Sequence, residues 1–411
     1  MNILPLLVKT CLALTTLCAV GSANAQGPWF SGLPVHWPTN TPAAGINIGR
    51  IAFGKGEFLA LGTVSGPSMT GDVALTSQDG LNWALHQVNT NLTQLGAVRA
   101  LTSSPSNFLA VCAFGTNMAA QLSVDGISWS RPTSVPGTAF FAAIWAEGLY
   151  VAVGENGTNS LIVSSPDGVN WTAHTWTNYG GLNAVTWGNG TFVAVGTGGV
   201  TFSSTNGLDW TAQLLPIDPA WFPRYLSTVT YGNGVFVASV PGHGGPIFTS
   251  SDGLRWEAYL NPTITWWGES EVGPEVWKMA FGEGLFFGIC EGGDLGVSAD
   301  GVNWVGEYLE GGALIPFDDV TYGNGTFVIT PPLWVYTMNF DLAVTRTASG
   351  TSQVTVNRGT LGQTYRIQGA ADVSATNWVD LVTLTNSISP TNWVDVGATN
   401  YPRRFYRVVS P

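Results

Sequence analysis

The sequence predicts an all-β protein built from repeated units, and three observations carry this prediction. The 411 residues include 52 glycines and 18 tryptophans, but only 10% are charged, which is well below the usual quarter. Apolar residues at helical spacing do not form long stripes, which argues against a helical protein. Two short motifs also recur along most of the chain, and such internal repeats outrank other sequence signals for fold class.

The first motif reads S-x-D-G-x-x-W and occurs six times, most clearly as SSDGLRW at Ser250–Trp256. Asp followed by Gly is typical of turns, because the carboxylate accepts hydrogen bonds from backbone N–H groups and Gly accepts a positive φ. A ligand site would occur once, whereas these copies return every 39 to 48 residues. We therefore interpret the motif as structural. Its residues are Asp79, Asp125, Asp167, Asn206, Asp252, Asp300, Trp83, Trp129, Trp171, Trp210, Trp256 and Trp304.

The second motif precedes the first and occurs seven times, for example as VTWGNGTFVAVG at Val185–Gly196. Its central Asn-Gly favours a two-residue hairpin turn. The strand that follows is apolar on both faces, as a strand buried between neighbouring sheets would be. One repeat thus divides into four strands, at residues 182–187, 192–195, 200–204 and around Trp210.

Four short strands in a period of 40 to 50 residues are typical of a propeller blade. The seventh unit, from Val320, lacks an S-x-D-G-x-x-W turn, but the segment Gly27–Thr39 carries an unassigned Trp37. That N-terminal segment could supply the missing outer strand and so leave no open edge. We expect a seven-bladed β-propeller over residues 26–338, closed by an N-terminal strand, with six or eight blades as the alternatives.

The two ends of the chain differ from the repeats. Residues 10–20 are apolar and follow Lys9, and Ala23-Asn24-Ala25 provides a small-residue cleavage site. Residues 1–25 therefore predict a secretory signal peptide, with an N-terminal element of the fold as the alternative. Export would place the protein outside the cell, in the periplasm or at the cell surface. Residues 339–411 alternate polar and apolar positions and predict a small C-terminal β-sandwich.

Composition also limits the function. The net charge of −12 argues against nucleic acid as a partner, because no basic stripe is present to neutralise phosphates. The four histidines are scattered singly, so we expect no metal, and no motif indicates a cofactor. No run outside the leader reaches 18 apolar residues, so we expect no transmembrane segment. We also expect a monomer. Cys112 and Cys290 occupy equivalent positions in non-adjacent repeats, which favours buried free thiols over a disulfide.

The six turns resemble the Asp-box (BNR) repeat of the sialidase-like propeller family, which includes sialidases, sortilin-type receptors, some xyloglucanases and photosystem assembly propellers. The resemblance covers about three quarters of the chain, although the usual box has a residue between Asp and Gly that these copies lack. It implies that the turns join the third and fourth strands, on the face opposite the binding site. The tail resembles the immunoglobulin- or fibronectin-like C-terminal modules of secreted bacterial proteins.

A binding site is therefore expected on the face opposite the boxes, where two connections between blades are long. They are Leu215–Tyr225 and Asn261–Trp277. Aromatic side chains that stack on sugar rings, beside carboxylates that bind hydroxyls, suit carbohydrate; the alternative is a plug for the wide end of the ring. The candidate ligand-binding residues are Trp221, Phe222, Arg224, Tyr225, His243, Trp266, Trp267, Glu269, Glu271, Glu275, Trp277 and Glu291.

Three function classes follow. The first is a secreted, non-catalytic protein that binds glycan or protein ligands on the face with the long connections. The second is a glycoside hydrolase, which would need two carboxylates across the scissile bond, such as Glu269, Glu271 or Glu275. The third is a structural or assembly-factor module at the cell surface. Sialidases carry an early F/Y-R-I-P motif. The nearest match in this chain, Tyr365–Gln368, lies in the tail instead. We therefore assign no catalytic residue.

Overall fold

A computed structural model of the chain gives the arrangement of its elements. The structure describes residues 30–33, 46–65, 70–90, 95–216, 225–242, 245–260, 263–266, 269–272, 275–290, 294–307, 319–330, 334–338, 342–346, 351–356, 364–370, 379–385, 391–395, 397 and 405–409. The expected leader, residues 1–25, and Trp37 lie outside this part of the chain. Two compact units are present, one of Gly32–Thr337 and one of Met1–Ser31 with Met338–Pro411. Each unit is described by itself.

The larger unit is built from blades, which we define as antiparallel sheets of consecutive strands whose last connection carries an S-x-D/N-G-x-x-W turn. Four blades are plain four-stranded sheets. Their strands are β2 (Ile46–Gly54), β3 (Glu57–Ser65), β4 (Thr70–Ser77) and β5 (Ala84–Gln87); β12 (Ala139–Ala146), β13 (Leu149–Asn156), β14 (Asn159–Ser165) and β15 (Thr172–Trp176); β16 (Leu182–Gly188), β17 (Thr191–Gly196), β18 (Val200–Ser204) and β19 (Thr211–Leu214); and β20 (Thr228–Gly232), β21 (Val235–Ser239), β22 (Ile247–Ser250) and β23 (Glu257–Tyr259).

Two further blades carry extra strands at their outer edge. One contains β7 (Ala97–Ser103), β8 (Phe108–Phe114), β9 (Asn117–Ser123), β10 (Ser128–Trp129) and β11 (Thr133–Ser134), and β6 (Asn89–Thr90) pairs in parallel with β10. The other contains β26 (Lys278–Gly282), β27 (Leu285–Ile289), β28 (Leu295–Ser298) and β29 (Trp304–Glu307). A hairpin of β24 (Thr263–Trp266) and β25 (Glu269–Val272) extends its edge, with β24 parallel to β29.

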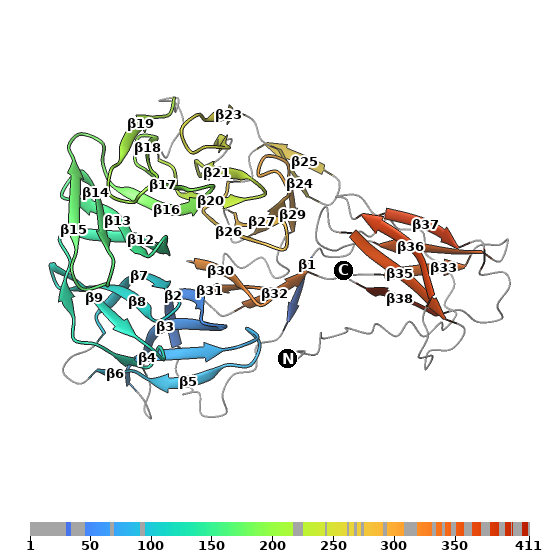
Figure 1. Ribbon diagram of the computed structural model, residues 1–411, viewed down its shortest axis with the longest axis horizontal. Helices are drawn as coiled ribbons and strands as arrows, with labels where there is room; N and C mark the ends of the chain where they lie inside the picture. Colours follow the sequence, from blue (N-terminus) through green and yellow to red (C-terminus); the bar gives the residue numbers. More distant parts are fainter. Residues whose placement is uncertain are drawn as a thin grey trace. The chain divides into compact units, whose positions relative to one another are not determined.

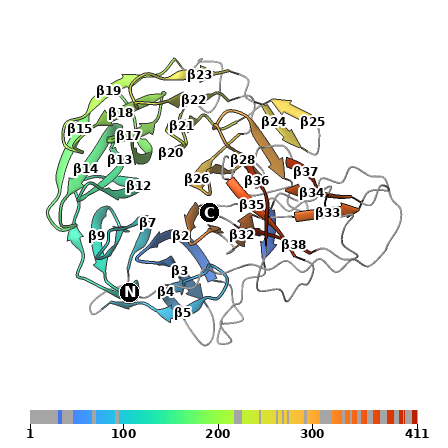
Figure 2. The same ribbon diagram turned by 45° about the vertical axis from the view of Figure 1, so that its right-hand side comes forward.

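The first strand of each blade lies on the inside of the propeller. These inner strands contact one another in the order β2, β7, β12, β16, β20 and β26, and they surround a common centre (Figures 1 and 2). A further sheet contains β30 (Asp319–Gly323), β31 (Thr326–Thr330) and β32 (Trp334–Met338), and β30 contacts both β26 and β2.

The expectation of seven blades is corrected to six. The sheet of β30 has the order β1-β32-β31-β30, where β1 is Phe30–Leu33. It lacks the S-x-D/N-G-x-x-W turn that defines the other six sheets. Phe30 and Ser31 fall in the other compact unit. A closing role for the N-terminal strand is therefore not shown.

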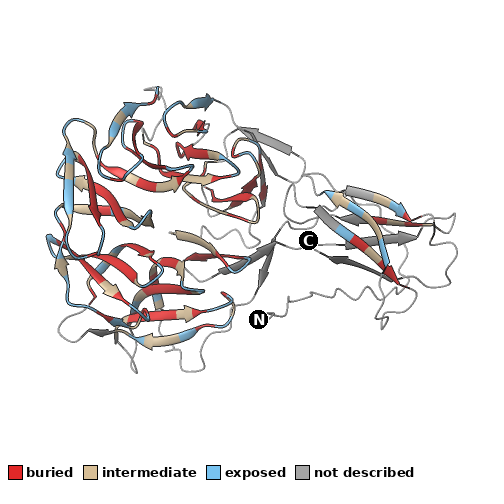
Figure 3. Ribbon diagram, viewed as in Figure 1, coloured by how far each residue is buried: buried red, intermediate tan, exposed pale blue. Residues whose placement is uncertain are grey.

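The hairpin and burial patterns explain why the repeats form blades. Both turn residues have positive φ in the Asn-Gly turns, for example 46° at Asn189 and 71° at Gly190, as the favoured hairpin turn requires. The second strands are buried along most of their length, and every residue of β17 and β27 is buried. The outer strands β15, β19 and β23 are largely exposed (Figure 3). Burial therefore decreases from the middle of each sheet toward its outer edge.

The S-x-D-G-x-x-W turns share one pattern of backbone hydrogen bonds to the Ser and to the Asp or Asn, and four of them add a bond from the Trp indole N–H to the Gly carbonyl. In the Asp167 turn, Oδ1 accepts hydrogen bonds from the backbone N–H groups of Val169 and Asn170, both at 2.8 Å, and Ser165 Oγ accepts one from Gly168. Asn206 holds its turn in the same way. The backbone hydrogen bond from Asn170 leads the contributions that lower the pKa of Asp167. These hydrogen bonds hold the backbone of the turns.

The smaller unit contains two three-stranded sheets. Their orders are β33-β34-β37 and β36-β35-β38, with β33 (Leu342–Arg346), β34 (Ser352–Val356), β35 (Thr364–Ala370), β36 (Val379–Thr385), β37 (Thr391–Asp395) and β38 (Phe405–Val409). Val354 and Ile367 are buried, with Val382, Leu384 and Trp393 packed against them. The expected β-sandwich of immunoglobulin or fibronectin type is not shown by these strands, and we describe the unit only as two small sheets.

Cys112 and Cys290 are free and buried, as expected from the sequence. Burial raises the pKa of the Cys112 thiol to about 12. Neither thiol is therefore a reactive group in the folded protein.

Candidate functional site

The beginnings of the inner strands bring charged side chains together at one end of the propeller. Arg50, Lys278 and Asp319 are opposite Leu61, Ile289 and Thr330 in their hairpins, which are equivalent positions in β2, β26 and β30. Arg99 on β7 and Phe141 on β12 lie one residue earlier in the same register. We refer to Arg50, Arg99, Phe141, Lys278 and Asp319 as the inner rim.

Asp319 links three of these strands. Its Oδ2 accepts a hydrogen bond from the backbone N–H of Ile51 at 3.3 Å, and its Oδ1 accepts one from Val320 at 3.1 Å. Burial raises the pKa of this carboxyl, although the positive charges of Lys278 and Arg50 work in the opposite direction. Asp319 is thus a buried carboxyl group that accepts two backbone hydrogen bonds and lies near two cations.

Bulges decide which side chains the rim presents. Four inner strands have a register shift at the same position, and the extra residues are Gly49, Arg99, Phe141 and Asn183. A bulge turns a side chain away from the regular alternation of the strand. Arg99 is exposed and Phe141 is 37% exposed. In contrast, Asn183 donates a hydrogen bond to Leu226 O at 3.0 Å and is therefore engaged within the fold.

Arg50 is held in place by backbone carbonyl groups. Its Nε donates to Arg99 O at 2.9 Å, and one terminal nitrogen donates to Gly49 O at 2.6 Å. These two bonds fix the guanidinium beside the β7 bulge. The side chain of Arg99 has no hydrogen-bond or ion-pair partner among the residues that the structure describes.

The two long connections end next to this rim. Tyr225 closes the first and forms a β-bridge with Thr197, while Trp277 closes the second and donates its backbone N–H to Ile289 O at 2.8 Å. Their rings lie edge to face, with centroids 6.5 Å apart. Trp277 directly precedes Lys278, so the aromatic pair and the charged rim adjoin.

Glu275 has a different environment. Its backbone is left-handed, with φ of 49°, and it lies close enough to the buried Cys290 to affect that thiol. Burial raises the pKa of Cys290, and the nearby carboxylates of Asp294 and Glu275 raise it further. The structure therefore places Glu275 beside an internal thiol.

The remaining expected ligand-binding residues divide into two sets. Trp266, Glu269 and Glu271 lie in the β24–β25 hairpin, where Trp266 is opposite Glu269 and Ile264 is opposite Glu271. This hairpin forms the outer edge of its blade, beyond β29, and so does not join Tyr225 and Trp277 at the inner strands. The others lie outside the described residues: Trp221, Phe222, Arg224, His243, Trp267 and Glu291.

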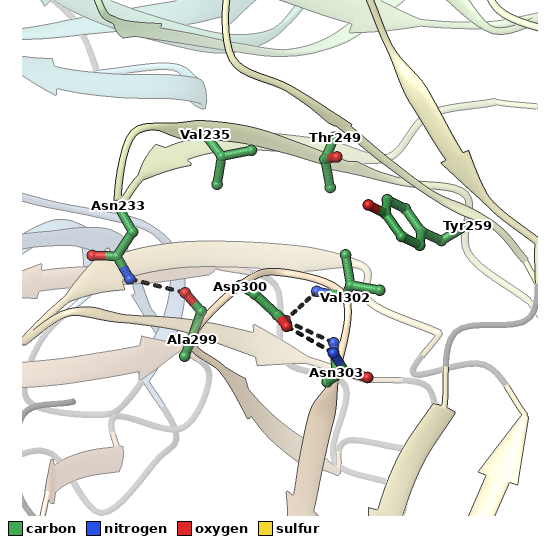
Figure 4. A pocket seen from close by; sticks show the side chains of 8 residues that line it. All are labelled: Asn233, Val235, Thr249, Tyr259, Ala299, Asp300, Val302 and Asn303. Atoms are coloured by element: carbon green, nitrogen blue, oxygen red, sulfur yellow. Dashed lines mark hydrogen bonds between the residues drawn. The ribbon is translucent and has the colours of Figure 1, made fainter. Parts of the chain in front are cut away.

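A cavity of about 430 Å³ lies on the face of the S-x-D-G-x-x-W turns, between two blades. Figure 4 shows Asn233 and Asp300 at this cavity, with their polar atoms bonded within the fold. Asn233 donates to Ala299 O at 2.9 Å, and Asp300 accepts from the backbone of Val302 and Asn303, both at 2.8 Å. Because these groups already serve the turns, we do not assign the cavity as the site.

The inner rim was not found from the sequence, although a signal for it is present. The residue before each second motif is Ala100, Ala142, Ala184 or Thr228 in four repeats, and it is Arg50, Lys278 or Asp319 in the other three. A charged residue at a position otherwise occupied by Ala or Thr marks a departure from the repeat. Arg99 and Phe141 can be assigned to the rim only when the bulges in their strands are known. No sequence pattern predicts a bulge here.

The described residues contain neither a candidate metal cluster nor a helix that could span a membrane. No cluster of three or more His, Cys, Asp or Glu side chains within them has the geometry to hold a metal ion. No helix in the same part of the chain is long and apolar enough to span a membrane.

Comparisons with known proteins identify the fold. No family model matches the sequence, and no curated protein matches it. The solved structure of PorZ, an essential bacterial surface component of the type-IX secretion system of Porphyromonas gingivalis, is similar with a TM-score of 0.56 at 12% identity. The match covers 91% of this chain and 60% of PorZ, so the chain spans about 60% of PorZ's length.

A second similar structure is YCF48 bound to D1 peptide, with a TM-score of 0.50 at 14% identity, over 76% of this chain and 98% of that one. At these identities the likeness concerns the fold alone. It agrees with the sheets described above, and the protein is a β-propeller.

Proposed function

We propose that this protein is a non-catalytic binding module that holds a protein partner on the end of the propeller where the inner strands begin. One observation carries the proposal: Tyr225 and Trp277, from two different connections, meet with centroids 6.5 Å apart beside Lys278. Loops and strand ends held by a rigid scaffold are the usual location of binding residues. The inner rim adds cations and an exposed aromatic ring to the same end.

The structural neighbours support this class of function. PorZ is described as a surface component of a secretion system, and YCF48 was solved with a bound peptide. Both descriptions fit a propeller that assembles with other proteins. A binding role on this scaffold needs no catalytic group.

We further propose that the chain is related to the Asp-box propellers and that it is exported. The turn geometry around Asp167 and Asn206 supports the first point, and the apolar leader of residues 1–25 supports the second. In this arrangement, residues 26–338 form the propeller segment and residues 339–411 form a separate C-terminal segment.

A glycan remains the alternative ligand for the same end of the propeller. Aromatic and carboxylate residues suit sugars in general, but the described aromatic pair is edge to face, and this arrangement does not present two parallel stacking plates. For a hydrolase, two carboxylates must face each other across the substrate. Glu275 lies beside Cys290 instead, so no observation favours that class.

The test is co-purification from the exported fraction of the producing cells, combined with glycan-array binding. Trp277→Ala removes the aromatic side chain at the proposed site. The control is Leu254→Ser, at a residue 48% exposed in an S-x-D-G-x-x-W turn, which we call a box turn from here on. We expect a specific protein partner that Trp277→Ala loses at least tenfold and Leu254→Ser retains. Loss of the partner in both variants, or array binding to a glycan that Trp277→Ala abolishes, would overturn the proposal of a protein ligand.

A further inference from the structure

The cations of the propeller are concentrated at one place in an otherwise acidic chain. The net charge of the protein is −12. Within the described part of the larger unit the cationic side chains are Arg50, Lys55, Arg99, Arg131, Arg255 and Lys278. Three of these six, Arg50, Arg99 and Lys278, belong to the inner rim. A local positive region on a negative protein attracts negative partners and steers their approach.

The carboxylate of the rim does not cancel this charge. Asp319 is one carboxyl group among three cations, and its two oxygens accept hydrogen bonds from the backbone of Ile51 and Val320. Asp294 and Glu275, on neighbouring segments, lie close to the buried Cys290. The five residues of the inner rim thus include three cations and one carboxyl group.

Donor groups for a carboxylate remain at the rim. A guanidinium has five N–H donors, and the two recorded bonds of Arg50 go to carbonyl oxygens of Arg99 and Gly49. Arg99 is exposed, and no described residue is a hydrogen-bond or ion-pair partner of its side chain. Arginine binds carboxylates with two parallel hydrogen bonds, which makes it well suited to hold an acidic side chain or a chain terminus.

Apolar groups lie beside these donors. Phe141 is in the β12 bulge, adjacent to the β7 bulge of Arg99, and is 37% exposed. Trp277 is half-buried and contacts Tyr225 edge to face. An apolar side chain of a peptide fits against such isolated ring surfaces, whereas a sugar ring requires a flat, open aromatic face. The combination therefore favours a peptide over an acidic glycan.

We propose that the inner rim binds an acidic, extended peptide segment of a partner protein, with Arg99 and Arg50 facing its carboxylates and Phe141 contacting an apolar side chain beside them. This inference rests on the proposed function and specifies the chemistry of its partner. It also gives a role to Arg99, whose exposed side chain makes no hydrogen bond or ion pair with a described residue.

Fluorescence anisotropy of a labelled ten-residue peptide tests the inference. The peptide carries Glu at every third position, separated by Gly and Leu, and is compared with the same peptide carrying Gln and with oligogalacturonate as an acidic glycan. The protein variants are Arg99→Gln and, as a matched control of the same charge change on a box turn, Arg255→Gln, whose side chain is 94% exposed. Thermal unfolding of each variant confirms that it is folded.

We expect the wild type to bind the Glu peptide at least tenfold more tightly than the Gln peptide at low salt, with the preference decreasing as salt is raised. Arg99→Gln should weaken binding about 5- to 10-fold, because a charge-assisted bidentate contact is lost. Arg255→Gln should change the affinity less than twofold.

Three results would overturn the inference: equal affinity for the Glu and Gln peptides, equal effects of Arg99→Gln and Arg255→Gln, or tighter binding of oligogalacturonate than of the peptide. These outcomes are separable from failure of the proposed function. If a protein partner still co-purifies in a manner that depends on Trp277, the binding role holds and only the acidic chemistry is wrong.

Discussion

Tyr231 occupies the space that a side chain at Gly188 would fill. A Cβ placed on Gly188, the last residue of β16, would lie 2.0 Å from Cγ of Tyr231 on the neighbouring inner strand β20. The same relationship recurs between Gly232 and Phe281 at 2.1 Å, and between Gly323 and Phe53 at 2.2 Å. The inner strands β16, β20, β26 and β30 thus end in a glycine that receives the aromatic ring of the following inner strand, which explains why the second motif pairs an aromatic residue with Gly in these repeats.

The first prediction concerns this contact. Gly188→Ala should destabilise the protein by about 2 to 3 kcal/mol, because the added methyl group overlaps the base of a ring that cannot move away freely. Urea unfolding monitored by tryptophan fluorescence measures the loss. Gly190→Ala is the control: it has open space around the added atom but a φ of 71°, so it should cost only about 1 kcal/mol.

A double-mutant cycle sharpens this test. Tyr231→Ala removes the ring that the alanine would meet, so adding Gly188→Ala to it should cost much less than adding Gly188→Ala to the wild type. Equal costs in the two backgrounds would show that Gly188 is required for a different reason than the contact with Tyr231.

The second prediction concerns Asp79 in the first box turn. Partial burial works to raise the pKa of Asp79, but hydrogen bonds from the backbone and side chain of Asn82 and from Leu81 outweigh it and lower the pKa to about 2. Since the pKa in the folded protein lies below the unfolded value of about 3.9, the stabilisation is present above pH 4. It is lost as the pH falls from about 4 toward 2.

Asp79→Ala should therefore cost about 1 kcal/mol at pH 6, similar to the loss of a capping residue. Asp79→Asn should cost less, because Asn206 shows that an amide oxygen accepts the same two backbone hydrogen bonds. Urea midpoints measured from pH 6 to pH 2 should show the advantage of the wild type over Asp79→Asn shrinking below pH 4. A difference that stays constant over this range would contradict the account of the lowered pKa.

The third prediction concerns side-chain hydrogen bonds between neighbouring blades. Asn233 sits in a hairpin turn with φ of 48° and donates its side-chain N–H groups to Gly284 O at 2.7 Å and Ala299 O at 2.9 Å, both in the next blade. Asn233→Gly keeps the left-handed turn and removes only these bonds, so it should cost about 1 to 2 kcal/mol. Thermal or urea unfolding measures the change.

Asn189→Gly serves as the matched variant for Asn233→Gly. Asn189 has φ of 46° and makes a single recorded bond of this kind, to Ser251 O at 3.0 Å. Its loss should therefore be smaller than that of Asn233→Gly. If the two substitutions cost the same, the second bond of Asn233 adds no stability.

Much of the propeller follows from the sequence because its features are local. The Asn-Gly turns, the buried second strands and the Asp and Ser hydrogen bonds all lie within a few residues of one another, so the repeat alone specifies them. In the fourth blade, the expected strand at 200–204 coincides with β18 (Val200–Ser204). The number of blades was overestimated because it depended on how the unmatched β30 unit and the distant segment around Trp37 were combined.

The candidate site was less predictable because it depends on contacts between repeats. The repeats place the two long connections before adjacent blades, but the edge-to-face contact of Tyr225 with Trp277, 52 positions away, follows only from the fold. The expectation for Trp266 assumed a loop tip, but the segment pairs in parallel with β29 and moves to the outer edge of its blade. The bulges that expose Arg99 and Phe141 arise from pairing with the next strand, which the sequence pattern does not encode in a recognisable form.

The central claim is that partners bind where the inner strands begin and that the box turns are structural. Site-specific photo-cross-linking tests it most directly, with a benzophenone amino acid at Phe141 on the inner rim or at Leu254 on a box turn, in the cells that produce the protein. The account predicts a discrete cross-linked partner from position 141 that Arg99→Gln reduces, and none from position 254. A partner that cross-links from position 254 but not from position 141 would contradict it.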